Sequence, residues 1–242
     1  MNHGQRERLG AATGIAAVVV IVASFVFGPG EPPGYGDSAE QVAAFVEDNR
    51  SALQAVTGLT ILAGVFLVWF LGSLSQALRR AEGSGPGRLA PVAFAGGILA
   101  FAFAGAGTAL QAATVYHEGL DPLVVQALWD SGNILYVFSG GAGFAILIGA
   151  SSVVALTAGG LPRWVGWFGA VLAVYTVVVA FLASFAEGGA FSPNNGALTL
   201  IAFLAFLVWL LAASIALVGR AGSGTGIEDG SRPAPTTGGG PA

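Results

Sequence analysis

The residues best suited to binding a metal ion occur together in one short stretch. His117 and Asp121 are four residues apart and Glu118 follows the histidine, a spacing similar to the helical zinc motif of metalloproteases. Gly119 and a nearby proline interrupt any helix at this point. The second histidine, His3, is far away near the N-terminus. We therefore expect a solvated loop here, with no metal and no catalytic residue.

A second group of polar residues lies within apolar segments of the chain. Gln54 and Thr57 are three residues apart and share one helix face, as do Thr108 and Gln111. Together with Tyr136, these faces would line a vestibule that opens to the outside of a membrane. The alternative is that threonine hydroxyls bond their own helix backbone while the glutamines make hydrogen bonds between helices.

Acidic residues are concentrated in the segments between the apolar stretches. The candidate cluster consists of Glu47, Asp48, Glu118, Asp121 and Asp130, with Glu187, Asn194 and Asn195 as possible additional ligands. Carboxylate and amide oxygens suit a hard cation such as calcium, so a divalent or organic cation is one hypothesis. The alternative is that these loops are acidic only because arginine is excluded from them.

These residues belong to a chain that is 55% apolar and only 9% charged over 242 residues, without cysteine. Six stretches are long enough to cross a bilayer, which takes about 20 residues. They run from Gly10 to Gly28, Ala52 to Leu78, Leu89 to Ala113, Ile134 to Ala158, Val165 to Ala186 and Ala197 to Val218. The sequence thus predicts an all-α, six-transmembrane-helix bundle over residues 10–220. The first helix could instead be a signal peptide with its cleavage site at Val22-Ala23-Ser24.

None of the six stretches contains Asp, Glu, Lys, Arg or His. Charged groups are costly inside a membrane and usually mark a functional site there. Their absence argues against a proton-coupled pump, a voltage sensor and an intramembrane protease. It leaves room for a facilitator that works with neutral groups.

The arginines predict the orientation, because short cytoplasmic loops retain positive charge. With the N-terminus inside, eight of the nine arginines lie in the cytoplasm and only Arg50 lies outside. Nine of the thirteen acids then lie outside. We therefore expect a plasma-membrane protein with both termini cytoplasmic, a short N-terminal segment over residues 1–9, and a disordered tail over 221–242.

The two longer outer loops are each expected to contain a short amphipathic helix. Ser38 and Gln41 have the spacing of a capping box at the start of the first. This helix is predicted to lie on the membrane surface, with partner binding as the alternative. A weak repeat at an offset of 83 residues places a second capped helix from Asp121 to about Trp129.

Small side chains and aromatic residues predict how the helices pack and where they meet the interface. A ridge of small residues on the third stretch is expected to face a similar ridge on the fourth. The first ridge consists of Gly96, Ala100, Ala104, Thr108 and Ala112, and the second of Gly141, Ala145 and Gly149. Such ridges let membrane helices approach closely. Arg163, Trp164 and Trp167 are expected to anchor the fifth stretch at the inner interface.

Several short motifs stand out along residues 10–220: Ser38-Ala-Glu-Gln-Val with Asp48-Asn-Arg, Trp69-Phe-Leu-Gly-Ser-Leu with Leu78-Arg-Arg-Ala-Glu, and Leu161-Pro-Arg-Trp-Val-Gly-Trp. Together they resemble a family of small, uncharacterised multi-pass membrane proteins of high-GC Gram-positive bacteria. The resemblance implies a membrane-embedded bundle. The family has no established activity, so the resemblance implies no catalytic residue.

Two classes of function follow from these observations. The first is a non-enzymatic membrane protein whose outer loops interact with a partner or with lipid. The second is a small-solute transporter, or a lipid- or cation-binding protein, that uses the outer vestibule. We expect membrane lipids as partners, with an unknown membrane partner as an open alternative, and neither nucleic acid nor a cofactor.

Overall fold

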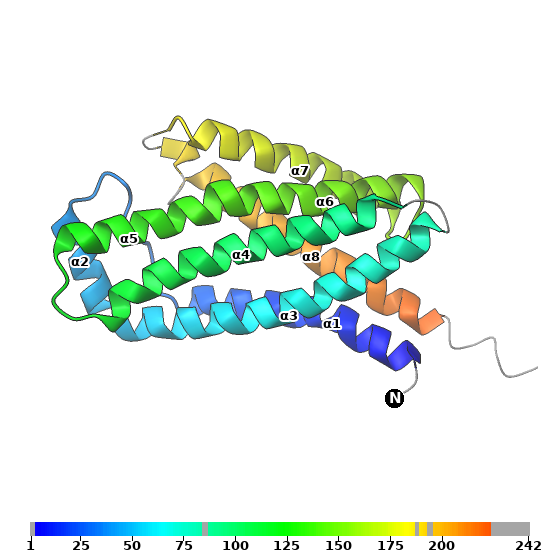
Figure 1. The fold of residues 1–242 in the computed structure, drawn as a ribbon, viewed down its shortest axis with the longest axis horizontal. Helices are drawn as coiled ribbons and strands as arrows, with labels where there is room; N and C mark the ends of the chain where they lie inside the picture. Colours follow the sequence, from blue (N-terminus) through cyan, green and yellow to red (C-terminus); the bar gives the residue numbers. More distant parts are fainter. Residues whose placement is uncertain (1–2, 84–86, 187–188, 193–195, 224–242) are drawn as a thin grey trace, which may run out of the picture.

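A computed structural model describes residues 3–83, 87–186, 189–192 and 196–223, and over these residues the chain is helical (Figure 1). Its helices are α1 (His3–Val26), α2 (Ala39–Asp48), α3 (Arg50–Glu82), α4 (Leu89–Tyr116), α5 (Pro122–Ile134), α6 (Gly141–Thr157), α7 (Arg163–Ala183) and α8 (Ala197–Ser223). A π-helical segment, η1 (Leu135–Gly140), joins α5 to α6, and a short 3-10 helix, η2 (Gly189–Phe191), precedes α8.

Six of these helical units are long and apolar enough to cross a membrane, which confirms the predicted number of spans. They are α1, α3, α4, the continuous α5–η1–α6 unit, α7 and α8. The chain is accordingly a multi-pass membrane protein. Most of the predicted tail, residues 224–242, lies outside the described residues.

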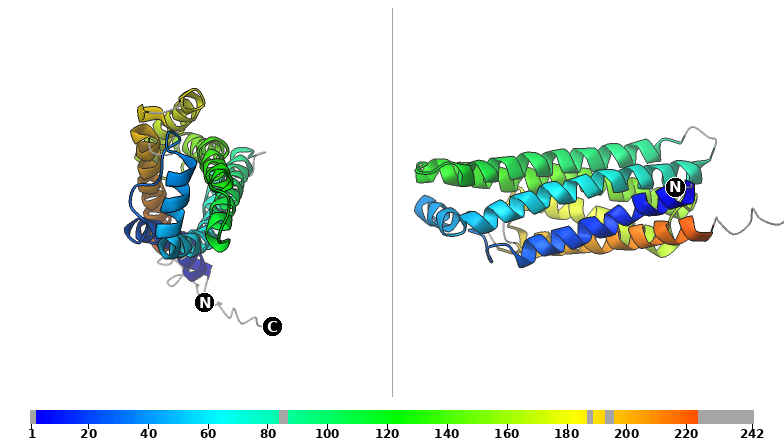
Figure 2. Two further views of the ribbon diagram at one scale, coloured as in Figure 1. Left: turned by 90° about the vertical axis from the view of Figure 1, so that its left-hand side faces the viewer. Right: turned by 90° about the horizontal axis from the view of Figure 1, so that it is seen from below.

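The six spans form a ring that follows the order of the chain. Each span packs against the next one, and α8 closes the ring by packing against α1. The start of α1 and the end of α8 lie at one end of the bundle, while α2 and the start of α5 lie at the other (Figures 1 and 2). Which end faces the cytoplasm stays a prediction from the arginines.

Two hydrophobic cores hold this arrangement together. The larger core lies among the spans and contains Phe70 and Leu71 of α3, Ile148 of α6 and Trp209 of α8, each at most 1% exposed. The smaller core lies at the end of the bundle that contains α2, which we call the outer end after its predicted orientation, and consists of Val42, Val46, Leu53, Val115, Val125 and Trp129. The outer loops therefore have a packed interior of their own.

The second predicted outer helix is not a separate element. It is expected to end near Trp129, ahead of a span that starts at Ile134, but α5 begins at Pro122 and continues through η1 into α6. Asp121 does cap its start, accepting a hydrogen bond from the backbone N–H of Leu123 at 2.9 Å. The helix continues because no residue after Trp129 breaks it, so outer helix and span form one unit.

The first outer helix, α2, begins with the predicted capping box at Ser38 and Gln41. Its apolar face packs against other parts of the protein, and the location of this helix on the membrane surface stays a prediction. Val42 and Val46 are buried in the outer core, and α2 packs against α5. The sequence alone did not show that α5 covers this face, because α5 lies some eighty residues further along the chain.

The small-residue contact between the third and fourth spans is confirmed, but it uses a different face of the fourth. A Cβ on Gly143 would lie 2.4 Å from the backbone nitrogen of Ala100, and one on Gly96 would lie 2.7 Å from that of Leu147. Gly141 and Gly149 instead face Ala180 and Ala173 of α7. The predicted ridge on the fourth span was therefore assigned to the wrong neighbour.

Candidate functional site

The outer half of α4 touches α5 at a pair of glycines. A Cβ on Gly107 would lie 2.7 Å from the carbonyl oxygen of Gly132, and one on Gly132 would lie 2.9 Å from that of Gly107. Both distances are shorter than real Cβ atoms tolerate. The two backbones are therefore in direct contact, and this contact brings together the polar side chains on either side of it.

Four polar residues meet at this contact, and we call them the polar seam: Thr108, Gln111, Asn133 and Tyr136. The amide nitrogen of Gln111 donates a hydrogen bond to the side-chain oxygen of Asn133 at 2.9 Å. The hydroxyls of Thr108 and Tyr136 are hydrogen-bonded to each other. The amide nitrogen of Asn133 is buried without a hydrogen-bond partner among the described residues. The seam thus offers one buried donor that is not yet satisfied.

The π-helical segment η1 forms part of this seam, because Tyr136 lies within it. A π-helical turn contains more residues than an α-helical one and often occurs at functional sites. It shifts the register of the helix between α5 and α6. As a result, Asn133 and Tyr136 both face α4 while Gly143, further along, also packs on α4.

The structure brings together only part of the predicted vestibule. Thr108, Gln111 and Tyr136 belong to the seam, whereas Gln54 is exposed and the Thr57 hydroxyl donates to the backbone carbonyl of Leu53 at 2.9 Å. Gln111 makes a hydrogen bond between helices, as the alternative interpretation stated. Asn133 was missed because the sequence placed it one residue before the fourth span.

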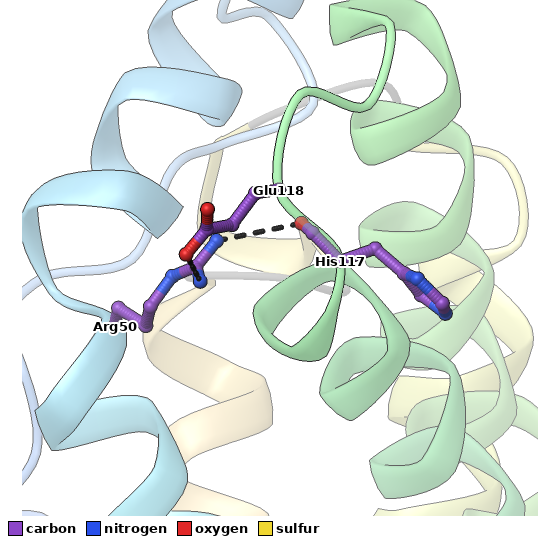
Figure 3. Close-up of polar contacts among 3 residues, drawn as sticks. All are labelled: Arg50, His117 and Glu118. Carbon is purple, nitrogen blue, oxygen red and sulfur yellow. Dashed lines mark hydrogen bonds and ion pairs between the residues drawn. The ribbon is translucent and has the colours of Figure 1, made fainter.

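The predicted acidic cluster is dispersed over several structural roles. Glu118 forms an ion pair with Arg50, the oxygen and nitrogen being 2.9 Å apart, and Arg50 also donates to the carbonyl of His117 at 3.4 Å (Figure 3). The imidazole of His117 points away from this pair (Figure 3). Asp121 caps α5, while Glu47 and Asp48 are exposed at the end of α2.

Within the described residues, no three acidic or histidine side chains lie close enough together to hold a metal ion. His117 follows the end of α4 in extended backbone, so the zinc-like spacing does not lie on a helix. Glu187, Asn194 and Asn195, the further candidates for a cation site, lie outside the described residues.

The outer segments fold into one unit, which we call the outer cap and define as residues 34–53 and 115–130. The rings of Phe45 and Trp129 meet edge to face, with centroids 5.7 Å apart. The side chain of Gln126 donates to the carbonyl of Asp37 at 3.1 Å, which ties the first outer loop to α5. Burial and the charge of Asp130 raise the pKa of Tyr35, in the same loop, to about 12.

At the opposite end of the bundle, the predicted interface anchor points outward from the first turns of α7. Trp164 and Trp167 are 60% and 65% exposed, and Arg163 is exposed as well. Val165 and Gly166, between them, are buried. The two indoles therefore lie on the surface of the bundle, and their contact with lipid stays a prediction.

Two buried polar side chains, Ser152 and Trp209, lie among α6, α7 and α8, and the sequence analysis did not single them out. Ser152 and Trp209 are at most 1% exposed, and neither Ser152 Oγ nor Trp209 Nε1 has a hydrogen-bond partner among the described residues. A Cβ on Gly169 would lie 2.3 Å from the first atom and 2.6 Å from the second. Both groups therefore pack on the bare backbone of this glycine.

Comparisons with known protein families, with curated proteins and with solved structures find no match to this chain.

Proposed function

We propose that this protein is a non-enzymatic membrane protein whose outer cap binds a positively charged partner. The observation that carries the proposal is the second hydrophobic core, which gives the outer segments a fixed shape. A helix that only lay on the membrane would keep its apolar face for lipid. In α2 this face is used internally, which leaves Glu40, Glu47 and Asp48 exposed to solvent.

A hollow in the outer surface supports a cationic partner. Its volume is about 500 Å³, and the residues that line it include Glu31, Asp37 and Phe45. Carboxylates attract a cation by charge, and an aromatic ring attracts it through its π face. This chemistry fits the basic side chain of a protein partner, with a free organic cation as the other source.

Site-specific cross-linking in living cells tests the proposal. A photoreactive phenylalanine analogue at the exposed Ala44 of α2 should give a discrete adduct, whereas the same analogue at the exposed Ala158, at the far end of the bundle, should not. Replacing Glu47→Gln and Asp48→Asn together should weaken the adduct without changing stability, because both side chains are exposed. An adduct that forms equally after this neutralisation would contradict a charge-based interface.

A second candidate function is small-solute binding at the polar seam. The supporting observation is the buried amide nitrogen of Asn133, which lacks a hydrogen-bond partner among the described residues. A ligand at 100 times its dissociation constant stabilises the folded state by about 2.7 kcal/mol, so a thermal-stability screen of short-chain metabolites and organic cations would detect it. Asn133→Leu should abolish any shift, and Thr57→Val, outside the seam, should retain it.

We also propose a plasma-membrane location with both termini in the cytoplasm, which rests on the distribution of arginines.

Membership of the family of high-GC bacterial membrane proteins is likewise a proposal, and it rests on the motifs quoted above. Because that family has no established activity, membership would assign no activity to this chain. Membrane lipids are the expected partners along the spans, where large apolar side chains such as Val171, Val174 and Phe181 are exposed.

A further inference from the structure

The end of the bundle that contains both termini has a cavity of about 350 Å³ between α1, α3 and α8. Part of its wall is apolar and part is charged, the first part including Ala11, Ala77 and Leu217 and the second Glu7, Arg80 and Arg220. The last turn of α8 also contributes Ala221 to the lining. The cavity is therefore amphipathic, and the chain continues from its edge into residues 224–242, which lie outside the described residues.

The charged groups of the wall leave one positive charge unbalanced. Arg80 of α3 forms an ion pair with Glu7 of α1. Arg220 is exposed in the last turn of α8 and has no ion-pair partner among the described residues. An occupant that matches this cavity therefore combines an apolar group, for the alanine and leucine wall, with a carboxylate for the guanidinium of Arg220.

One segment of the chain itself has this combination. Residues 224–242 contain a single large aliphatic side chain, Ile227, and two carboxylates follow it directly, Glu228 and Asp229. Ile227 is four residues beyond the end of α8 at Ser223, a reach of up to about 14 Å. Leu217 lies about 9 Å back along the helix. The residues between are Gly-Thr-Gly, and glycine allows the tight turn that this return requires.

We propose that Ile227 and the two carboxylates after it occupy this cavity, with the isoleucine against the apolar wall and a carboxylate paired with Arg220. A short tether keeps the segment at an effective concentration of about millimolar. The modest contributions of one apolar side chain and one exposed ion pair are then sufficient for docking. The segment thus closes the bundle at the end opposite to the outer cap, an interaction separate from the cationic partner proposed there.

Single thiols test the proposal, because the chain contains no cysteine. Gly226→Cys lies beside Ile227, and Gly238→Cys, further along the same tail, is the matched control. For the full chain in detergent, each rate of maleimide labelling is divided by the rate in denaturant, which removes differences in thiol reactivity. We expect this ratio to be about tenfold lower for Gly226→Cys, which corresponds to about 1.4 kcal/mol of docking.

Further substitutions in the Gly226→Cys background test the two proposed contacts. Ile227→Ser and Arg220→Glu should each raise the labelling ratio to the value of the Gly238→Cys control. Arg79→Glu should leave the ratio low, because Arg79 is an exposed arginine in the last turn of α3 that does not line the cavity. An effect of positive charge in general would instead change the ratio in both arginine variants.

Reversing both partners separates a specific ion pair from an effect of Arg220 on its own helix. Arg220→Glu combined with Glu228→Arg and Asp229→Arg should restore slow labelling of Gly226→Cys. Equal ratios for Gly226→Cys and Gly238→Cys in the otherwise natural chain would overturn the proposal and leave the cavity to a ligand from outside the chain. Protection that survives Arg220→Glu, or a reversed pair that stays unprotected, would overturn it as well.

Discussion

Polar residues inside the spans satisfy their hydrogen-bonding groups in two ways. Thr57 and Thr176 donate to carbonyls of their own helices, whereas Thr108 donates to the carbonyl of Ala104 and is also hydrogen-bonded to Tyr136 of the neighbouring unit. Gln111 and Asn133 bond across two helices, and such bonds contribute about 0.6 to 2 kcal/mol in a membrane. The sequence shows both kinds of residue but does not show which threonine or amide will find a partner.

The half-buried phenol of Tyr35 predicts a pH dependence of stability. Its pKa is raised from about 10 in the unfolded chain to about 12 by burial and the nearby charge of Asp130. The folded state thus holds the proton more tightly, so stability is unchanged below pH 10 and falls as the pH rises toward 12. Denaturation followed between pH 9 and 12 should show this fall in the natural chain and a smaller one in Tyr35→Phe. Equal falls in both would show that Tyr35 is not the titrating group.

At the scale of elements, the fourth span determines the outer architecture. Because α5, η1 and α6 form one continuous unit, the same helix supplies Trp129 to the outer core, Asn133 and Tyr136 to the seam, and Gly143 to the contact with α4. The outer cap and the membrane bundle are therefore mechanically connected through this unit.

The glycine contact between α4 and α5 predicts different outcomes for two similar substitutions on α4. Gly107→Ala places a methyl group against the backbone of α5 and should destabilise the protein by about 1 to 3 kcal/mol, as overpacking does. Gly105→Ala, where a Cβ meets open space, should be neutral or stabilising by up to about 1 kcal/mol through helix propensity. Melting of both variants in detergent tests this. Equal effects would mean that the helices do not touch at Gly107.

The outer core predicts a local effect of Trp129→Ala. Trp129 is 4% exposed and packs on Phe45, and truncating such a side chain costs about 3 to 5 kcal/mol. Hydrogen exchange should accelerate in α2 and the start of α5 while α7 keeps its protection. The exposed Trp69 provides the control, since Trp69→Ala should leave exchange in α2 unchanged. Unaltered exchange in α2 of Trp129→Ala would refute the outer core.

At the scale of the whole molecule, aromatic side chains lie between the helices of the bundle. The phenyl ring of Phe144 on α6 contacts the phenyl rings of Phe101 on α4 and Phe206 on α8, with centroids 5.8 and 4.4 Å apart. These three rings join helices on opposite sides of the bundle. A solute path through the centre would have to displace them, which is why we favour binding at the surface over transport.

The orientation in the membrane is testable because the chain contains no cysteine. Single cysteines at Gly36, in the first outer loop, and at Ala158, at the other end of the bundle, serve as reporters. With both termini cytoplasmic, a membrane-impermeant maleimide should label Gly36→Cys on intact cells and label Ala158→Cys only after permeabilisation. The reverse pattern would invert the orientation.

The sequence by itself determined the number of spans, the approximate limits of all but the fourth, and the caps at Ser38 and Asp121. These features depend on local composition and on hydrogen bonds between residues a few positions apart, so neighbouring residues suffice to predict them. Three of the five predicted vestibule residues also meet in the structure, because two of them share a face of α4.

Only the tertiary structure decided what each helix face contacts. The apolar face of α2 could have met lipid as readily as α5, and Gly141 could have faced α4 as readily as α7, because any small or apolar surface offers a similar gain on burial. The choice between such partners depends on residues distant in the chain and on the register shift at η1. The polar seam and the outer core both arise from that choice.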